Sequence, residues 1–158
     1  MTRRDRTREA GSGVQRGGTQ RTPDTSTFDG GCFCGAVRFR LTAPLTQACY
    51  CHCNSCRRSS GAPFVAWCTV GTDRFALAHG RLALHESSPG VSRGFCAQCG
   101  TSLTYAHDER PGEIDVAIAA LDDSVPVAPT RHIWVEDKLP WLRIDDGLPQ
   151  FQRFSGQA

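Results

Sequence analysis

Residues 49–61 read CYCHCNSCRRSSG, a stretch unusually dense in thiols. It holds four cysteines in eight residues, which are Cys49, Cys51, Cys53 and Cys56. Thiols this close along the chain have little freedom to form disulfides with one another, and a packed core does not need so many sulfur atoms. The whole chain has nine cysteines, an odd number, and its N-terminus shows no apolar secretory leader. Metal binding is therefore the leading explanation for these cysteines.

Two further cysteine pairs lie on either side of this stretch, and both have metal-ligand spacing. The pairs are Cys32-Phe33-Cys34 and Cys96-Ala97-Gln98-Cys99. A CxxC turn brings two thiolates onto one ion, and a CxC on an extended chain places both side chains on one face, about 6.6 Å apart at Cα. Zinc favours thiolates, needs no redox partner and takes four ligands in structural sites. We predict that the two pairs form a closed four-sulfur zinc site that clips distant ends of a sheet together.

The dense stretch supplies a second set of ligands. Cys51, Cys53 and Cys56 offer three sulfurs, and three protein ligands with one open position are the pattern of a catalytic zinc. Alternatively, Cys49 on the same strand face or His52 closes the shell and makes a second structural site. An iron–sulfur cluster is less favoured, because the spacings match no common ferredoxin run.

Length and composition predict one soluble domain with a tail. The 158 residues, 39% of them hydrophobic and 22% charged, suit a single core. Residues 1–27 are predicted to be a disordered Arg/Gly-rich tail, and 28–155 a zinc-binding domain. Six arginines and three acidic residues give the tail a charge of +3, so the total of +2 leaves −1 for the domain, and no nucleic-acid partner is expected. No apolar run approaches the roughly 20 residues of a membrane span, and the expected compartment is the cytoplasm.

Short apolar runs between Gly-, Pro- and Asp-rich breaks predict an all-β domain with many turns. Val37, Phe39 and Leu41 alternate with arginines, the period of a half-buried strand. Further short strands are predicted at 64–70, 81–86, 94–96, 102–105 and 113–121. At most one helical turn is predicted after Cys53, and 128–144 are predicted to be irregular with a short extended piece.

Four separated motifs together resemble the glutathione-dependent formaldehyde-activating enzyme family, which also includes centromere protein V. They are GGCFCGAVRF (30–39), CYCHCNSCRRSSGAPFVAW (49–67), GFCAQCGTSLTY (94–105) and RHIWVEDKLPWLRIDDGLPQF (131–151). The resemblance runs in order from about Phe28 to Phe151, which is essentially the whole domain. It implies an Mss4-like β-tent, that is, small antiparallel sheets pinned by zinc.

The resemblance also implies two zinc ions per chain and a reaction. One zinc is structural, at Cys32, Cys34, Cys96 and Cys99, and the other is the reaction centre, at Cys51, Cys53 and Cys56. The implied activity joins glutathione to formaldehyde as S-hydroxymethylglutathione, a carbon–sulfur lyase reaction run in reverse. A small thiol and a small aldehyde are then the partners, and the family allows a homodimer.

Two other functions compete with the enzyme. In the first, both zincs are structural and the domain binds a partner, as the centromere-protein branch of the family suggests. In the second, Cys49 and Cys68 carry thiol redox chemistry, which requires both to be exposed with depressed pKa values. The structural interpretation of Cys68 is that it is a small core residue in an apolar strand.

Several polar residues near the motifs have both a functional and a structural reading. Arg57 and Arg58 can bind an anionic substrate or make ordinary ion pairs. His52 is expected to be structural, because a residue between two ligands on a strand points to the opposite face. His132 and Trp134 either line a pocket or pack, and packing is favoured for Trp134. Separately, Gly35 and Gly100 are predicted to take a positive φ that turns backbone N–H groups toward the sulfurs.

Overall fold

The computed structural model describes residues 25–124 and 127–154, and these form ten strands, one α-helix and three short 3₁₀ turns. The strands are β1 (Thr27–Gly31), β2 (Arg38–Thr42), β3 (Thr46–Cys51), β4 (Val65–Gly71), β5 (Phe75–His79), β6 (Ala83–Ser88), β7 (Val91–Phe95), β8 (Ser102–His107), β9 (Glu113–Ala117) and β10 (His132–Ile133). The helix is α1 (Asn54–Ser60), and the turns are η1 (Thr72–Arg74), η2 (Ile118–Ala120) and η3 (Val135–Asp137).

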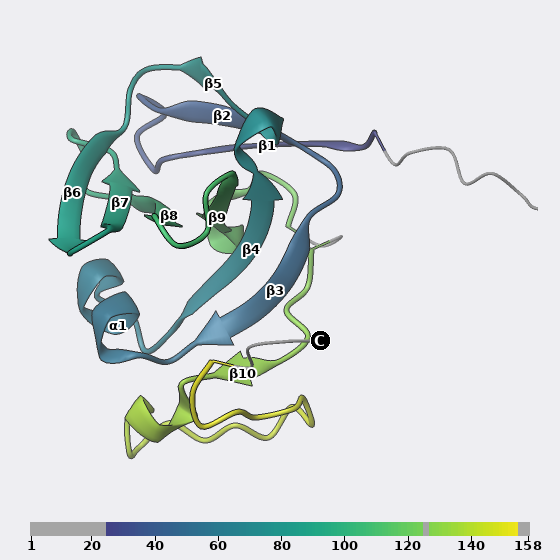
Figure 1. The fold of residues 1–158 in the computed structure, drawn as a ribbon, viewed down its shortest axis with the longest axis vertical. Coiled ribbons are helices and arrows are strands. Elements are labelled where there is room, and N and C mark those ends of the chain that lie inside the picture. Colours follow the sequence, from purple (N-terminus) through teal and green to yellow (C-terminus); the bar gives the residue numbers. More distant parts are fainter. Residues whose placement is uncertain (1–24, 125–126, 155–158) are drawn as a thin grey trace, which may run out of the picture.

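The strands form two sheets. The smaller has the order β1-β2-β5, and the larger has the order β10-β3-β4-β9-β8-β7-β6. Figure 1 shows the smaller sheet across one end of the larger one, with α1 and the C-terminal segment at the other end. Every pairing between these strands is antiparallel except that of β10 with β3, which is parallel.

The buried apolar residues form two hydrophobic cores. The first lies between the sheets, where Phe39 and Leu41 of β2 pack with Val116 of β9 and Leu103 of β8. These side chains are at most 1% exposed, so each adds roughly 1.5–3 kcal/mol of hydrophobic stabilisation before entropy is counted. The second core lies beneath α1 and is built around Trp67 of β4. The first core holds the sheets together, and the second surrounds the dense cysteine stretch.

The prediction of an all-β fold is confirmed, and the predicted strands at 64–70, 81–86, 94–96 and 102–105 all overlap observed ones. Three local expectations were wrong. Helix α1 has seven residues instead of at most one turn, because Cys53 caps its start and Gly61, with φ of 67°, ends it. Strand β9 ends at Ala117, and the predicted alternation gives way to η2. The family resemblance implied antiparallel sheets, but the pairing of β10 with β3 is parallel.

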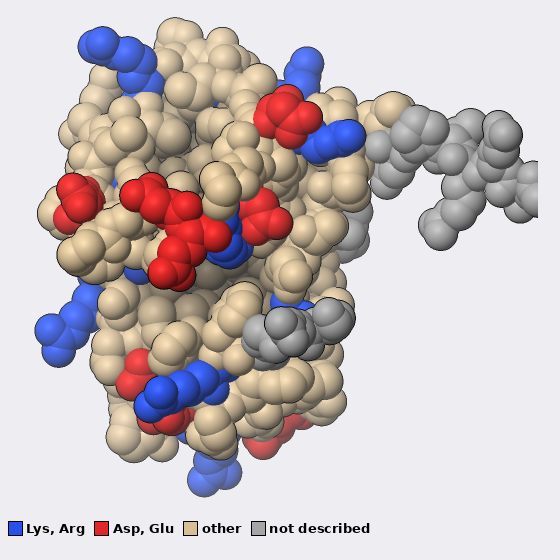
Figure 2. Space-filling view, viewed as in Figure 1, with Lys and Arg blue, Asp and Glu red and all other residues tan. Residues whose placement is uncertain are grey.

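The N-terminal boundary of the fold, the described helices and the surface charge bear on the remaining expectations from the sequence. Strand β1 begins at Thr27, one residue before the expected boundary, and the tail predicted over 1–27 otherwise lies almost wholly outside the described residues. None of the described helices is long and apolar enough to span a membrane. On the face in Figure 2, acidic side chains gather over the region of β8 and β9, whereas basic side chains are scattered.

Candidate metal centres

Four cysteines from two separate loops form the first cluster, with all their sulfur atoms within 4.8 Å of one another. They are Cys32, Cys34, Cys96 and Cys99. The Sγ atom of Cys34 lies 3.6 Å from that of Cys32 and 3.8 Å from that of Cys96. Zinc bonded tetrahedrally to sulfur at about 2.3 Å places its ligands about 3.8 Å apart. The first cluster therefore has the donor atoms and the spacing of a closed zinc–thiolate site.

Matching turns position the two cysteine pairs. The Cys32 N–H donates to the carbonyl of Val37 at 3.0 Å, and the Cys96 N–H donates to that of Thr101, also at 3.0 Å. Gly35 and Gly100 follow the pairs with φ of 78° and 74°, so the predicted positive φ is confirmed at both. The first pair lies in a turn and not on an extended strand as expected. The first cluster joins the turn after β1 to the turn between β7 and β8, and so connects the two sheets and not two ends of one.

Backbone and side-chain donors also surround these sulfurs. The Val37 N–H donates to Cys32 Sγ at 3.2 Å, and Thr101 Oγ1 lies 3.1 Å from Cys99 Sγ. Hydrogen bonds from the Thr101 side chain and backbone lower the pKa of the Cys99 thiol to about 5. Such donors favour the thiolate, which is the form that binds a metal.

Three cysteines at the junction of β3 and α1 form the second cluster. Cys51 ends β3, Cys53 caps the helix and Cys56 lies in its first turn, with the three sulfur atoms within 4.8 Å of one another. The Cys56 N–H donates to Cys53 Sγ at 3.3 Å, so the helix cap itself fixes the second sulfur. Within 25–124 and 127–154, no fourth Cys, His, Asp or Glu atom joins the second cluster. It therefore offers a metal three protein ligands.

A buried arginine that no sequence motif distinguishes adjoins the second cluster. Both terminal nitrogens of Arg93 on β7 lie 3.9 Å from Cys56 Sγ. Hydrogen bonds with Cys51 and Cys53 lower the pKa of Cys56, and the charge of Arg93 adds to that effect. Hydrogen bonds with Cys53 and Cys56, together with burial, raise the pKa of Cys51. The environment thus favours a first thiolate at Cys56.

The two remaining cysteines are buried outside both clusters. Cys49 is 7% exposed, and Cys68 is fully buried in the first core, as predicted for a small core residue. Burial raises the pKa of each thiol to about 12. This is the opposite of the exposed, acidic thiols that redox chemistry needs, so the redox alternative is wrong for this pair.

Comparison with known proteins identifies the family of this chain. Residues 27–137, which contain all seven clustered cysteines, match the family described as glutathione-dependent formaldehyde-activating enzyme. The chain belongs to that family. A Halomonas elongata protein provisionally named as such an enzyme is 32% identical over 130 residues, covering 75% of this chain and 81% of its own length. An uncharacterised lyase of Schizosaccharomyces pombe is 30% identical over 81 residues, and these cover 51% of this chain and 58% of the lyase.

A solved structure has a similar fold. The crystal structure of a Rhodobacter sphaeroides protein superposes with a TM-score of 0.51 and 22% identity, covering 78% of this chain and 98% of the other. The formaldehyde-activating enzyme family resemblance inferred from the four motifs is therefore confirmed, and the similar structure supports the fold.

In this family member, His52 lies between two ligands of the second cluster but points elsewhere. Its Nε2 lies 2.8 Å from Nδ1 of His132, whose own Nε2 lies 2.8 Å from a carboxylate oxygen of Asp146. An ionised Asp146 can only accept, so His132 donates to it from Nε2, and the tautomers of the two histidines set the direction of the bond between them. The expected structural role of His52 agrees with this chain of bonds, which ties the C-terminal segment to the strand that carries Cys51.

The two histidines also line a cavity of about 200 Å³, together with Tyr50, Phe64 and residues 142–146. His132 therefore both packs and lines a pocket, because it is only 3% exposed. Trp134 packs against the second core, as expected. This cavity contains none of the clustered cysteines.

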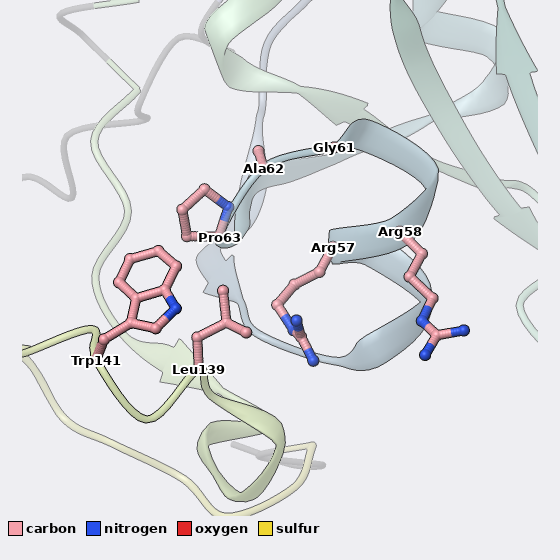
Figure 3. A pocket seen from close by; sticks show the side chains of 7 residues that line it. All are labelled: Arg57, Arg58, Gly61, Ala62, Pro63, Leu139 and Trp141. Carbon is pink, nitrogen blue, oxygen red and sulfur yellow. The ribbon is translucent and has the colours of Figure 1, made fainter.

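A second cavity, of about 360 Å³, lies beside the arginines that follow Cys56. Figure 3 shows Trp141 and Leu139 near Pro63 on one side of it, with Arg57 and Arg58 rising from α1 and Arg58 pointing away from Trp141. Arg57 donates to the His52 carbonyl at 3.3 Å and to the Asn54 side chain at 2.5 Å. Arg57 therefore holds the start of the helix, and this supports its structural reading.

Proposed function

We propose that this protein is a zinc-dependent carbon–sulfur lyase that forms or cleaves S-hydroxymethylglutathione or a closely related thiol–aldehyde adduct. One observation carries the proposal. The second cluster brings three sulfurs together without a fourth protein ligand among the described residues, in a chain of the glutathione-dependent formaldehyde-activating enzyme family. Three protein ligands and an open position are typical of catalytic zinc sites.

The proposed reaction adds a thiol across a carbonyl group. The thiol gives up its proton, its sulfur forms a bond to the carbonyl carbon, and the carbon–oxygen π bond breaks. The new alkoxide takes up a proton, so the adduct contains all the atoms of thiol and aldehyde and no electrons are gained or lost. Cleavage of the adduct is the same sequence in reverse.

Cys51, Cys53 and Cys56 are assigned to hold the reaction-centre zinc. When bound there, zinc would supply a positive charge that holds the substrate sulfur as a thiolate. Three thiolates and one zinc dication carry a net charge of −1, which weakens zinc as a Lewis acid toward the aldehyde. The three cysteines therefore favour binding of the thiol over polarisation of the carbonyl group.

The first cluster is assigned a structural zinc. Its four sulfurs would close the coordination shell of that zinc, and they come from loops that belong to different sheets. Both clusters need reduced thiols, in keeping with the cytoplasmic compartment expected from the sequence.

The proposal is tested with zinc-loaded wild type and the Cys53→Ser variant, and Cys49→Ser serves as a matched control. Cys49 is a buried thiol of the same core but lies outside the second cluster. Native mass spectrometry counts zinc and bound glutathione, and NMR exchange spectroscopy measures the rate of adduct formation from glutathione and formaldehyde. Wild type and Cys49→Ser should bind two zincs and accelerate the exchange, whereas Cys53→Ser should keep one zinc and lose the acceleration.

Two zincs in a wild-type protein that ignores glutathione and several other small thiols would contradict the enzymatic proposal. The binding-module alternative, with both zincs structural, would then be favoured. An exchange rate that is unchanged in Cys53→Ser would contradict the assignment of the second cluster as the reaction centre.

A further inference from the structure

Arg93 is the one charged Asp, Glu, Lys or Arg side chain that is buried within 25–124 and 127–154, with 7% of its surface exposed. Its Nε donates to Ser87 Oγ at 3.1 Å, and its Nη1 donates to Ser59 Oγ at 3.3 Å. Its guanidinium carbon lies 5.0 Å from the centre of the Tyr105 ring. The remaining contacts are the two 3.9 Å approaches to Cys56 Sγ. None of these partners is a carboxylate.

A buried guanidinium without a counter-charge is costly. An arginine side chain keeps its positive charge in proteins, and removing a charge from water is strongly unfavourable unless an opposite charge replaces the water. Hydroxyls and an aromatic face compensate only in part. The four arginines that form ion pairs within the described residues, Arg38, Arg40, Arg110 and Arg153, all have carboxylate partners. For Arg93, the thiol sulfurs of the second cluster are the groups that can provide a negative charge.

We propose that Arg93 is a positioning residue that supplies the counter-charge of the second cluster and so lets it hold a metal and an incoming anionic thiolate. Three thiolates and a metal dication carry −1, and Arg93 brings this local charge to zero. A substrate thiolate then raises the negative charge to −1, whereas without Arg93 it would reach −2. The inference rests on the proposed function in one respect, namely that the second cluster binds a metal.

Arg110 provides a matched control on the same aromatic ring. Its guanidinium carbon lies 5.9 Å from the centre of the Tyr105 ring, but it pairs with Asp115 at 2.6 Å and with Glu113 at 3.3 Å. Replacing Arg110 therefore removes a cation near Tyr105 without removing one from the sulfurs. A purely packing role for Arg93 and a counter-charge role can be separated in this way.

The experiment compares wild type, Arg93→Met, Arg93→Lys and Arg110→Met, each loaded with cobalt or zinc. Competition with a chromophoric chelator measures the affinity for each metal, and the sulfur-to-cobalt charge-transfer band reports the thiolate ligands. Arg93→Met should bind the second metal about 10–100-fold more weakly, the range for groups that support ligands from outside the coordination shell. Arg93→Lys should recover part of this loss, and Arg110→Met should behave as wild type.

Glutathione binding to the two-metal proteins provides a second readout. Arg93→Met, saturated with metal, should bind glutathione at least about tenfold more weakly, because the fourth ligand arrives as an anion. Wild-type affinity of Arg93→Met for both the second metal and glutathione would overturn the inference alone. A wild-type protein that binds a single metal would overturn the proposed function, and the inference with it.

Loss of folding in Arg93→Met is recognised by loss of the first metal and of the far-ultraviolet circular dichroism spectrum. The Arg93→Lys variant then decides the question, because it retains the charge and most of the volume. If Arg93→Lys folds and yet binds the second metal no better than Cys53→Ser does, the charge is not what the second cluster requires, and the inference fails.

Discussion

Replacing one ligand in each cluster should separate a metal that holds the fold from a metal that serves the reaction. The first cluster spans 62 residues between Cys34 and Cys96, whereas the ligands of the second lie within 51–56. An unfolded chain can still gather the nearby ligands around a metal, but gathering the distant ones requires closure of a long loop. The difference in closure entropy is about 2 kcal/mol for these lengths. Metal in the first cluster should therefore add about 2 kcal/mol more to folding than metal in the second.

We expect Cys99→Ser to unfold about 6–8 °C below Cys53→Ser when both are measured with excess zinc, given about 3–4 °C per kcal/mol for a domain of this size. Differential scanning calorimetry gives the two midpoints, and elemental analysis confirms the loss of one zinc from each. Cys49→Ser corrects for the cost of placing a hydroxyl where a buried thiol stood. Equal midpoints for Cys99→Ser and Cys53→Ser would refute the division of roles, because both metals would then support the fold equally.

Three further changes test the geometry elsewhere. Gly80→Ala should lower the free energy of unfolding by about 3 kcal/mol, because φ at Gly80 is 74° and an added Cβ would lie 1.9 Å from a backbone oxygen. Gly61→Ala, where an added Cβ meets open space, should lower it by about 1 kcal/mol. Denaturant titration measures both changes. The hydrogen bond from His132 lowers the pKa of Asp146. The stabilisation from this bond is therefore present at pH values above the ordinary carboxyl range, and it is lost at lower pH. The difference in unfolding midpoint between wild type and Asp146→Asn should accordingly shrink as the pH falls through and below the ordinary carboxyl range of about 4. Cys49 and Cys68, whose pKa values burial raises to about 12, should resist iodoacetamide at pH 8 in the zinc-loaded protein, and rapid labelling seen by mass spectrometry would contradict this.

Strong alternation and turn residues made much of the fold predictable. Phe39 and Leu41 alternate with arginines because β2 has one face in the first core and the other toward solvent. Strand β5 was not predicted, because most of its side chains are exposed and its sequence FALAH carries no clear alternation of buried and exposed positions. The helix was underestimated although Gly61 supplied a stop signal, because the cap at its start is a cysteine and not one of the usual capping residues.

The grouping of the seven clustered cysteines could be predicted because CxC and CxxC spacings are local patterns, but spacing left Cys49 and His52 open as further ligands of the second cluster. Arg93 could not be predicted in the same way. It lies 37 residues from Cys56, and an arginine on a short strand gives no sign in the sequence of whether it faces solvent or sulfur. Only the pairing of β7 within the large sheet brings it to the helix. The His132 contact with His52 likewise depends on the parallel pairing of β10 with β3, which local patterns do not predict.

The two roles proposed for the thiol clusters follow from where each cluster lies in the fold. The first cluster joins loops that belong to different sheets, so a metal there completes a cross-link and gains most by having a full shell of protein ligands. The second cluster takes all its sulfur atoms from one strand end and the helix that follows, so a metal there would add little to the long-range architecture. A site that the fold does not need for closure can keep an open position. In our proposal, Arg93 lowers the cost of such a site in a buried setting, because its positive charge would offset the excess of thiolate.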